Sequence, residues 1–280
     1  MPRASHEGRV ETFREGAAVL KIDSSISAIV TGGASGLGEA TVRRLASAGA
    51  KVAIFDMQRE RGAKVAAETG ALFCDTDVTN ERSIEAAMAK ARRAHGVERI
   101  LVCCAGIGAA QRTVSKKRET GELLAHDMAM FRRVIEVNLI GTFQVISKSA
   151  LAMASLEPAT ADGTRGVIVA TASVAAQDGQ IGQAAYAASK GGVMALALPV
   201  ARDLASYGIR VSTILPGLFH TPMFDTLREE ARQALAASVP FPPRLGLPDE
   251  YAALVEAIIG NEMINGATIR LDGALRMAPK

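Results

Sequence analysis

The sequence predicts one doubly wound α/β domain, a Rossmann-type fold with a mostly parallel sheet. Short β-branched apolar runs alternate with longer segments of helical period from residue 26 onward. The apolar runs are continuous, which is typical of parallel strands buried on both faces. No repeat or Pro/Ser-rich linker interrupts the 280 residues, and 49% hydrophobic residues with a net charge of +3 exclude a disordered chain.

The strand and helix boundaries follow from the apolar runs and from the glycines that end the helices. Strands are expected at Ile26–Thr31, Lys51–Phe55, Ala71–Cys74, Ile100–Cys104, Val167–Thr171, Arg210–Leu215 and Thr268–Leu271. Helices are expected at Leu37–Ala48, Arg59–Thr69 and Asn80–His95, each followed by a glycine (Gly49, Gly70 and Gly96).

Three segments fall outside the alternation. Residues 1–23 are polar, lack the apolar core of a secretory signal and contain glutamates that a mitochondrial transit peptide avoids, so they are expected to form an extension of a domain spanning 24–280. Gly106–Glu122 is expected to be an irregular loop. Residues 217–247 hold a small helix, Leu227–Ala237, near the Pro-rich segment 240–243, and are expected to form a substrate lid.

The composition also argues against several functional classes. Three cysteines without a CxxC pair and four scattered histidines predict no disulfide framework and no metal site, and they favour a reducing, cytoplasmic location. The longest apolar stretches, such as Gly191–Ala201, are shorter than the roughly 20 residues of a membrane span. The single basic run, Lys116–Arg118, in a chain with 4% aromatics is interpreted as a solvated loop rather than a nucleic-acid site.

A glycine-rich turn between the first strand and the first helix indicates a nucleotide site. In Thr31–Gly38, Gly32 permits the tight turn, Gly36 the close approach of a pyrophosphate, and Gly38 the packing of helix on strand. The spacing GxxxGxG is a variant of the dinucleotide fingerprint, and its strand-before, helix-after context favours that function over a simple structural turn.

Acidic residues after the next two strands are the candidates for contacts with the rest of a dinucleotide. Asp56 follows the glycines by about 20 residues, where a carboxylate accepts hydrogen bonds from ribose hydroxyls and repels a 2′-phosphate. The sequence therefore predicts NAD over NADP, unless Asp56 only caps the following helix. Asp77 and the Val78 backbone are placed to contact the adenine, although an aspartate in such a turn is usually a cap. Cys104 and Gly106 close the fourth strand beside the cofactor; the vicinal pair with Cys103 is interpreted as packing rather than redox chemistry.

Tyr186 and Lys190 form a candidate acid/base pair. They lie at i and i+4 of a predicted helix, so both side chains point the same way. A nearby ammonium favours the phenolate, and we expect Lys190 to lower the tyrosine pKa from about 10. The surrounding alanines and glycines leave the helix without a polar face, which predicts that the pair is buried.

Two further polar residues complete the constellation. Ser173 lies just past the end of a strand, where its hydroxyl could hold a substrate oxygen against Tyr186. Asn138 is a polar residue within an apolar helical stretch, and a buried asparagine needs partners; it could hold a water that links Lys190 to solvent.

Together these residues resemble the short-chain dehydrogenase/reductase family from residue 26 to the C-terminus. The motifs that carry the resemblance are Thr31–Gly38, Asp77-Val78, Asn138, Ser173, Tyr186/Lys190 and Pro216-Gly217. The longest shared stretches, which include Val239–Pro242 and Ile269–Ala274, are those of a subgroup that oxidises 3-hydroxyacyl-CoA thioesters. The polar segment after Gly106 also resembles an extra loop of that subgroup.

The resemblance implies an NAD-linked oxidation of a secondary alcohol, in that subgroup the 3-hydroxyl of an acyl-CoA. It implies Tyr186 as acid/base, Lys190 as the group that lowers its pKa and binds the nicotinamide ribose, and Asn138 as support for a proton relay. It implies a homotetramer packed through the helices of Asn138 and Tyr186 and the C-terminal strand. It places substrate at Ser173, Gln180, Gln183 and Tyr186, and NAD at Gly32, Ser35, Gly36, Leu37, Gly38, Asp56, Asp77, Val78, Cys104, Gly106, Tyr186, Lys190, Phe219 and Thr221.

Two residues depart from the family pattern, and the second of them, His220, leaves the choice of substrate open. Cys103 stands where the family has asparagine, which removes an amide that braces the sheet, and His220 stands where the subgroup has glycine. The alternatives are a 3-oxoacyl-carrier-protein reductase that uses NADPH and a steroid, sugar-alcohol or other secondary-alcohol dehydrogenase. A non-catalytic scaffold or RNA-binding protein is opposed by the intact set of Ser173, Tyr186 and Lys190.

Overall fold

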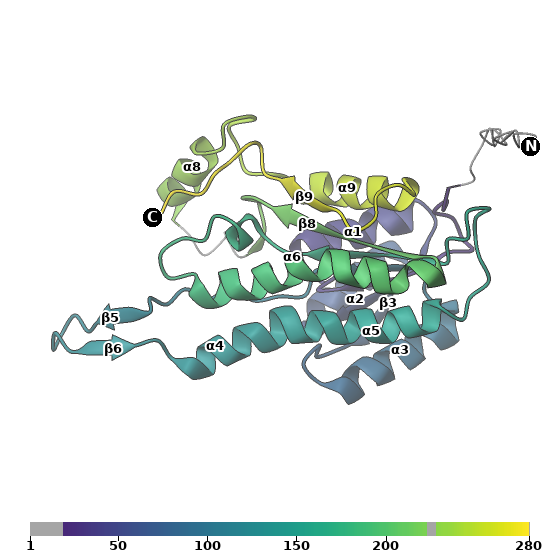
Figure 1. Ribbon diagram of the computed structural model, residues 1–280, viewed down its shortest axis with the longest axis horizontal. Helices are drawn as coiled ribbons and strands as arrows, with labels where there is room; N and C mark the ends of the chain where they lie inside the picture. The colour runs from purple at the N-terminus through teal and green to yellow at the C-terminus, as the bar shows by residue number, and fades with distance from the viewer. Residues whose placement is uncertain (1–18, 223–227, 280) are drawn as a thin grey trace, which may run out of the picture.

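The structure is a computed structural model that describes residues 19–222 and 228–279. A seven-stranded parallel sheet lies between two layers of helices, which confirms the predicted doubly wound α/β fold (Figure 1). The strand order is β3-β2-β1-β4-β7-β8-β9. The strands are β1 (Ser27–Thr31), β2 (Lys51–Asp56), β3 (Leu72–Asp75), β4 (Ile100–Cys103), β7 (Gly166–Thr171), β8 (Ile209–Pro216) and β9 (Thr268–Leu271).

Each face of the sheet is covered by its own set of helices. One core contains α3 (Glu81–His95), α5 (Thr142–Met153) and α6 (Ala184–Leu204). The other contains α1 (Gly36–Ser47), α2 (Arg59–Thr69) and α9 (Pro248–Gly260). The remaining described helical elements are α4 (Met128–Ile135), η1 (Glu136–Gly141), η2 (Val174–Ala176), η3 (Ala205–Tyr207) and α8 (Glu229–Ala237).

The continuous apolar strands fill both cores because neighbouring side chains point to opposite faces. In β1, Ile29 packs in the core of α3, α5 and α6, whereas Ala28 and Val30 pack in the core of α1 and α9. All three are at most 1% exposed. This double burial is the physical reason why the strands do not alternate apolar with polar residues.

The strand order reverses direction next to β1, and this reversal determines where a ligand binds. The chain passes from β1 outward through β2 to β3, then returns to the other side of β1 as β4. The loops after β1 and β4 therefore diverge to opposite faces, and the crevice between them is where open α/β sheets bind ligands. Gly32, Asp56 and Cys104 all lie at this edge.

Two of the irregular segments differ in part from expectation. The predicted loop Gly106–Glu122 contains β5 (Val114–Lys116), which pairs antiparallel with β6 (Leu123–Ala125) in a hairpin that projects beyond α4 (Figure 1). Pairing of Lys116 with Leu123 gives this polar segment a regular structure that its composition does not indicate. Within residues 217–247, the small helix is α8; residues 223–227 lie outside the described part of the chain.

The described part of the chain begins within the predicted extension. Of the predicted extension 1–23, only the residues from Val19 onward are described. Leu20 is 3% exposed and packs with the core beside Ile26 and Ala50. The last residues of the extension therefore contribute to the core.

One helical segment of the described chain, Ala184–Tyr207, is long and apolar enough to cross a membrane. It includes α6, which packs on β8 and η2 in this fold, and it carries the buried Lys190. Helices in the core of a globular protein have the same composition, so the segment is weak evidence for a membrane span.

Candidate active site

Two adjoining cavities lie at the carboxyl edge of the sheet. The larger, about 340 Å³, is lined by residues that follow β1, β2, β3 and β4. The smaller, about 130 Å³, is lined by Ser173, Tyr186 and Lys190 among others. The two share five lining residues: Leu37, Cys104, Gly106, Ile107 and Thr221. The pair thus forms one elongated site with the nucleotide motifs at one end and the acid/base residues at the other.

The glycine-rich turn has the conformation that a phosphate cradle requires. Gly32 and Gly36 adopt positive φ angles of 65° and 55°. A Cβ at Gly38 would lie 2.1 Å from the carbonyl oxygen of Gly32, so only glycine fits there. Ser35 at the N-cap of α1 makes no side-chain capping hydrogen bond. The first amides of α1 lack intrahelical partners and carry the positive end of the helix dipole, so this turn fits a dinucleotide pyrophosphate.

Asp56 lines the larger cavity and is anchored by backbone groups. Its Oδ2 accepts a hydrogen bond from the Ala34 N–H at 3.0 Å, and its Oδ1 accepts one from the Gln58 N–H at 2.9 Å. The residue is 8% exposed. Gln58, not Asp56, is the N-cap of α2, so the carboxylate joins the turn after β1 to the end of β2 at the cavity wall.

The turn after β3 contributes Asp77 and Val78 to the same cavity. Asp77 Oδ1 accepts hydrogen bonds from the Thr79 N–H at 2.9 Å and the Thr79 hydroxyl at 2.7 Å. The cap of α3 is Asn80, which accepts from the Ser83 N–H. Asp77 therefore stabilises its own turn and also borders the cavity.

The segment after β8 contributes two further lining residues to the joined cavities. Phe219 is 5% exposed and lines the smaller cavity, and Thr221 lines both cavities. His220 between them is exposed and lines neither; its N–H donates to the Gly246 carbonyl at 2.8 Å. Phe219 and Thr221 are thus brought to the predicted cofactor site, whereas the His220 side chain is not.

Lys190 is buried next to the Tyr186 ring. Its Nζ lies 5.9 Å from the ring centroid and donates a hydrogen bond of 2.8 Å to the Thr171 carbonyl at the end of β7. Lys190 is 6% exposed, and burial lowers its pKa from 10.5 to about 8. The predicted burial is therefore confirmed for Lys190, whereas Tyr186 is half-buried where it borders the cavity.

The expected direction of the Tyr186 pKa shift is not found in the structure. Burial raises the pKa of Tyr186 above its usual value of 10, and a hydrogen bond with Ser173 offsets only part of that rise. The physical reason is that removing the phenol from water disfavours the phenolate, while Lys190 makes no direct contact with the phenol oxygen that would compensate.

Ser173 lies between β7 and η2 and faces Tyr186 across the smaller cavity. Its Oγ accepts a hydrogen bond from the Ala175 N–H at 3.2 Å, which orients the side chain at the N-cap of η2. The hydroxyl also hydrogen-bonds Tyr186. An oxygen atom of a ligand placed in this cavity would thus meet two hydroxyl groups.

Asn138 is fully buried in η1, a π-helical turn between α4 and α5. Its amide donates to the Ile107 carbonyl at 2.9 Å and to the Ser189 hydroxyl at 3.0 Å, and its oxygen accepts from the Ile107 N–H at 2.8 Å. A Cβ at Gly106 would lie 3.2 Å from Asn138 Oδ1 and 3.4 Å from Lys190 Nζ. Asn138 therefore holds the loop after β4 beside Lys190.

Of the vicinal cysteines, Cys104 lines both cavities and Cys103 lies in the hydrophobic core behind it. Burial raises the pKa of both Cys103 and Cys104, so both thiols are held in the neutral form. Cys104 Sγ accepts from the Thr171 hydroxyl at 3.5 Å and donates to the Tyr251 hydroxyl at 3.6 Å. Among the described residues, no group of three or more His, Cys, Asp or Glu could hold a metal ion.

The two predicted substrate glutamines do not lie with Ser173 and Tyr186. Gln180 and Gln183 line a separate open cavity between the β5–β6 hairpin and the start of α6. The Gln183 side chain accepts from the Gln180 N–H at 3.0 Å, and the Gln180 amide donates to the Ala278 carbonyl at 2.9 Å. Their polar groups are used to hold the loop and the C-terminal segment, which the local sequence cannot indicate.

Thr171 and Ser189 are site residues that the sequence analysis did not single out. Thr171 supplies the carbonyl that accepts from Lys190, and its hydroxyl lies 2.7 Å from that of Tyr251. Ser189 joins the carbonyl of Tyr186, at 2.7 Å, to the Asn138 amide. Ser189 stands inside the five-residue motif Tyr186–Lys190, and a polar residue on a helix predicted to be buried could have indicated its role. Thr171 contacts Lys190 through its backbone carbonyl, which no side-chain pattern in the sequence can indicate.

Comparisons with known proteins agree with this geometry. The family model "short chain dehydrogenase" matches residues 27–232. The chain is 52% identical to "3-hydroxyacyl-CoA dehydrogenase type-2" of Drosophila melanogaster, covering 90% of this chain and 97% of that protein. It is 50% identical to the Bos taurus protein of the same name, covering 94% and 100%.

A solved structure is similar over nearly the same span. The crystal structure of 3-hydroxyacyl-CoA dehydrogenase type-2 from Mycobacterium avium has a TM-score of 0.84 and 46% identity, and the match covers 91% of this chain and 98% of that one. Dehydrogenases of this family generally use NAD or NADP. The chain therefore belongs to the short-chain dehydrogenase family and is an oxidoreductase that acts on CH–OH groups.

Proposed function

We propose that this protein oxidises the 3-hydroxyl group of a 3-hydroxyacyl-CoA to a ketone with NAD as cofactor. The observation that carries the reaction type is the meeting of Ser173, Tyr186 and Lys190 in a cavity that adjoins the glycine-rich dinucleotide site. The substrate class rests on relatives of that name that are about half identical over nearly their whole length.

The residues of this chain have distinct roles in the proposed reaction. The Ser173 hydroxyl donates a hydrogen bond to the substrate oxygen and holds it against Tyr186. The Tyr186 oxygen accepts the hydroxyl proton as general base and returns it in the reverse direction. A nicotinamide held at this site would supply the acceptor for the hydride of the carbinol carbon, so that the alcohol loses one hydride and one proton in total. Lys190 binds the ribose beside Tyr186 and favours the phenolate, and Asn138 holds the loop along which the proton reaches solvent.

The preference for NAD follows from the charges around Asp56. The carboxylate lies at the cavity wall, where it accepts hydrogen bonds from ribose hydroxyls and repels a 2′-phosphate. The nearest following cation, Arg59, is already paired with Asp75 at 2.6 Å. A 2′-phosphate would thus meet a negative charge without a free positive partner from this strand end.

The decisive experiment is a substrate panel. Purified protein is mixed with NAD and, side by side, a 3-hydroxyacyl-CoA, a hydroxysteroid and a simple secondary alcohol, and NADH formation is followed. We expect the acyl-CoA to have the highest kcat/KM. Turnover of a steroid or a simple alcohol with higher kcat/KM would reassign the substrate, and tighter binding of NADP than of NAD would overturn the cofactor.

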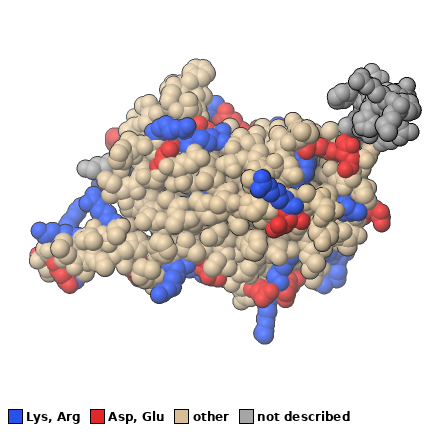
Figure 2. Space-filling view, viewed as in Figure 1, with Lys and Arg blue, Asp and Glu red and all other residues tan. Residues whose placement is uncertain are grey.

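We further propose a homotetramer that packs through the helices bearing Asn138 and Tyr186 and through β9. The outer face of α5 and α6 exposes Phe143 (46%), Leu151 (78%) and Leu198 (47%), and a groove of about 370 Å³ runs between these helices. Few charged side chains interrupt the middle of this face (Figure 2). Apolar patches of this kind favour association with another protein surface. Light scattering of the unmodified protein and of Leu151→Lys tests this proposal, because a monomeric unmodified protein would contradict it.

A cytoplasmic location is also a proposal, supported by the three free cysteines. Fractionation of cells that express the full chain with a C-terminal tag tests it. Recovery of the protein in an organelle or in the membrane fraction would contradict it.

A further inference from the structure

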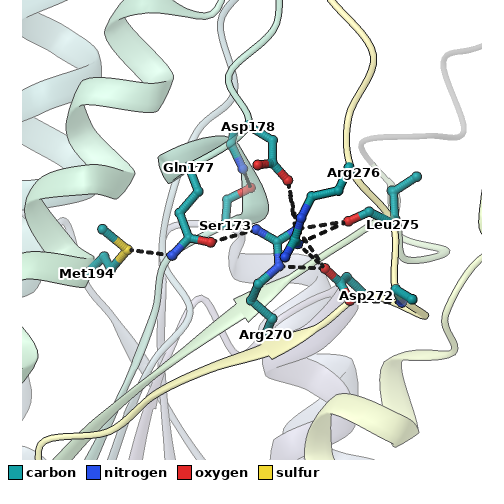
Figure 3. A network of polar contacts seen from close by, with 10 residues as sticks. Ser173, Gln177, Asp178, Met194, Arg270, Asp272, Leu275 and Arg276 are labelled. Carbon is teal, nitrogen blue, oxygen red and sulfur yellow. Dashed lines mark hydrogen bonds and ion pairs between the residues drawn. The ribbon is translucent and has the colours of Figure 1, made fainter.

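Arg270 on the edge strand β9 lies at the centre of a network of polar contacts (Figure 3). Its guanidinium donates to the Gln177 side-chain oxygen and to Asp178 Oδ2, each at 2.7 Å. It also donates to Asp272 Oδ2 at 2.7 Å and to the Leu275 carbonyl at 2.9 Å. The Arg270 side chain is 16% exposed, so these charge-assisted contacts are largely shielded from water.

Gln177 and Asp178 belong to the turn that orients Ser173. The Gln177 and Asp178 N–H groups both donate to the Val174 carbonyl, at 3.0 and 2.8 Å. The Ala176 N–H donates to the Ser173 carbonyl at 3.0 Å, and the Ala175 N–H donates to the Ser173 hydroxyl, so two residues of this short helix hold Ser173. Only this one turn, η2, separates the Ser173 hydroxyl from the residues that Arg270 holds.

The same guanidinium is also linked, through Asp272, to a second segment that lines the smaller cavity. Asp272, its second carboxylate partner, packs against Gly217, where a Cβ would lie 2.8 Å from the Asp272 Cβ. Gly217 lines the cavity together with Ser173. The Gly217 N–H further donates to the Leu271 carbonyl at 2.9 Å, next to Arg270 in the chain. Arg270 therefore connects two walls that come from segments far apart in the sequence.

We propose that Arg270 is a positioning residue for the oxidation, which acts by holding the η2 turn so that the Ser173 hydroxyl faces Tyr186. This inference rests on the proposed role of Ser173. The planar guanidinium provides donors in two directions at once, toward Gln177 and Asp178 and toward Asp272, which a lysine ammonium cannot match. Arg270 touches neither cavity, so its contribution passes through Ser173.

A double-mutant cycle tests this inference. Arg270→Gln and Ser173→Ala are made singly and together, and kcat, the KM for the alcohol and the affinity for NADH are measured for each. We expect Arg270→Gln to lower kcat by about 10- to 100-fold, since displacement of a catalytic hydroxyl by a fraction of an ångström to one ångström has effects of this size. NADH affinity should change less than about twofold, because the nucleotide end lies away from η2.

The cycle separates positioning from general destabilisation. In the Ser173→Ala background, loss of Arg270 should lower kcat less than about twofold, because the hydroxyl that Arg270 positions is already absent; a second effect through Asp272 and Gly217 would appear as a larger loss. A full further loss in that background, or a parallel loss of NADH affinity, would overturn the inference. Arg276→Gln is the matched control: its guanidinium lies 3.6 to 3.8 Å from the same two carboxylates but the side chain is 67% exposed, and its kcat should stay within about twofold.

Arg270→Lys keeps the inference testable if Arg270→Gln does not fold. The lysine keeps the positive charge but lacks the planar set of donors of a guanidinium, so kcat should be intermediate and NADH affinity unchanged. Full activity of Arg270→Lys would contradict the need for a guanidinium. The cycle uses whichever secondary alcohol the unmodified protein turns over best. A wrong acyl-CoA assignment therefore appears in the substrate panel and leaves this test unaffected.

Discussion

The two ends of the joined cavities are built in different ways. At the nucleotide end, the turn after β1 and the ends of β2 and β3 supply the wall, and Asp56 binds the backbone of Ala34 and Gln58. At the catalytic end, Ser173, Tyr186 and Lys190 depend on groups from distant segments. Lys190 is held by the end of β7, and the Ser173 turn is held by Arg270, 92 residues after Asp178.

This difference separates recognition by backbone shape from catalysis by side-chain placement. Glycine at positions with no room for a Cβ is required by local geometry, and its spacing can be seen in the sequence. The orientation of a hydroxyl or an ammonium depends on tertiary contacts that no short motif contains. Substitutions of the Ser173 or Tyr186 hydroxyl should therefore lower the rate with little change in cofactor affinity, whereas substitutions at the nucleotide end should change cofactor affinity with little change in rate.

The largest effect is expected for Tyr186→Phe at the catalytic end. The variant keeps the ring that packs beside Lys190 but loses the oxygen that accepts the proton, so kcat should fall about a thousandfold. NADH formation under saturating substrate measures the rate, and fluorescence titration measures NADH affinity, which should stay within about twofold.

Tyr207→Phe is the control for that experiment, because it removes the same hydroxyl from a half-exposed surface residue. It should leave kcat unchanged. If Tyr186→Phe retained more than about a tenth of the rate, Tyr186 would not be the general base, and the proposed difference between the two ends of the site would be wrong.

Lys190 should make the stability of the cofactor-free protein depend on pH. Its pKa is about 8 in the folded state against 10.5 ordinarily, so between these values the unfolded chain binds more protons. The free energy of unfolding should consequently rise with pH across this window, by roughly 3 kcal/mol from this residue. Below pH 8 the lysine is charged in both states and the full cost of its burial is present.

Urea unfolding of the unmodified protein and of Lys190→Met at both ends of the window isolates this contribution, because other titrating groups are common to both proteins. The variant should lack the rise. Parallel pH dependence in the two proteins would show that Lys190 is not appreciably desolvated.

Asp56→Asn tests the nucleotide end. The substitution keeps an oxygen that can accept from Ala34 but removes the charge that repels a 2′-phosphate. The ratio of NADP to NAD affinity should rise about tenfold, while kcat with saturating NAD changes less than about threefold. Glu60→Gln, an exposed charge change in the first turn of α2, is the control and should leave the ratio unchanged. A fall in kcat larger than the change in affinity would mean that the two ends are not independent.

The smallest effect is expected for Gln183→Ala. Its side chain contacts Gln180 and lines a cavity apart from Ser173, so kcat/KM should change less than about threefold. Steady-state kinetics with the best alcohol of the panel measures it. A larger fall would return Gln183 to the substrate contacts that the family resemblance implies.

The sequence predicts most of the fold and the residues that form the two cavities. Continuous apolar runs located the seven strands because both faces of the sheet are buried, and helical spacing placed Tyr186 and Lys190 together. The β5–β6 hairpin was missed because each of its strands has only three residues, too few to show an alternating pattern. Thr171 and Arg270 were missed because their contacts are with segments distant in the chain, and the Tyr186 pKa shift because burial is a tertiary property.

The wide turn η1 has a consequence for the helices on either side of it. A π-helical turn adds one residue relative to a regular helix, and each residue of a regular helix rotates the next side chain by about 100°. A chain one residue shorter at this point would close the wide turn into a regular one, and the exposed Phe143 and the buried Val145 would keep their directions. Deletion of one residue within η1 should thus leave the packing of α5 in place, whereas deletion of one residue within α5 should rotate every side chain that follows it.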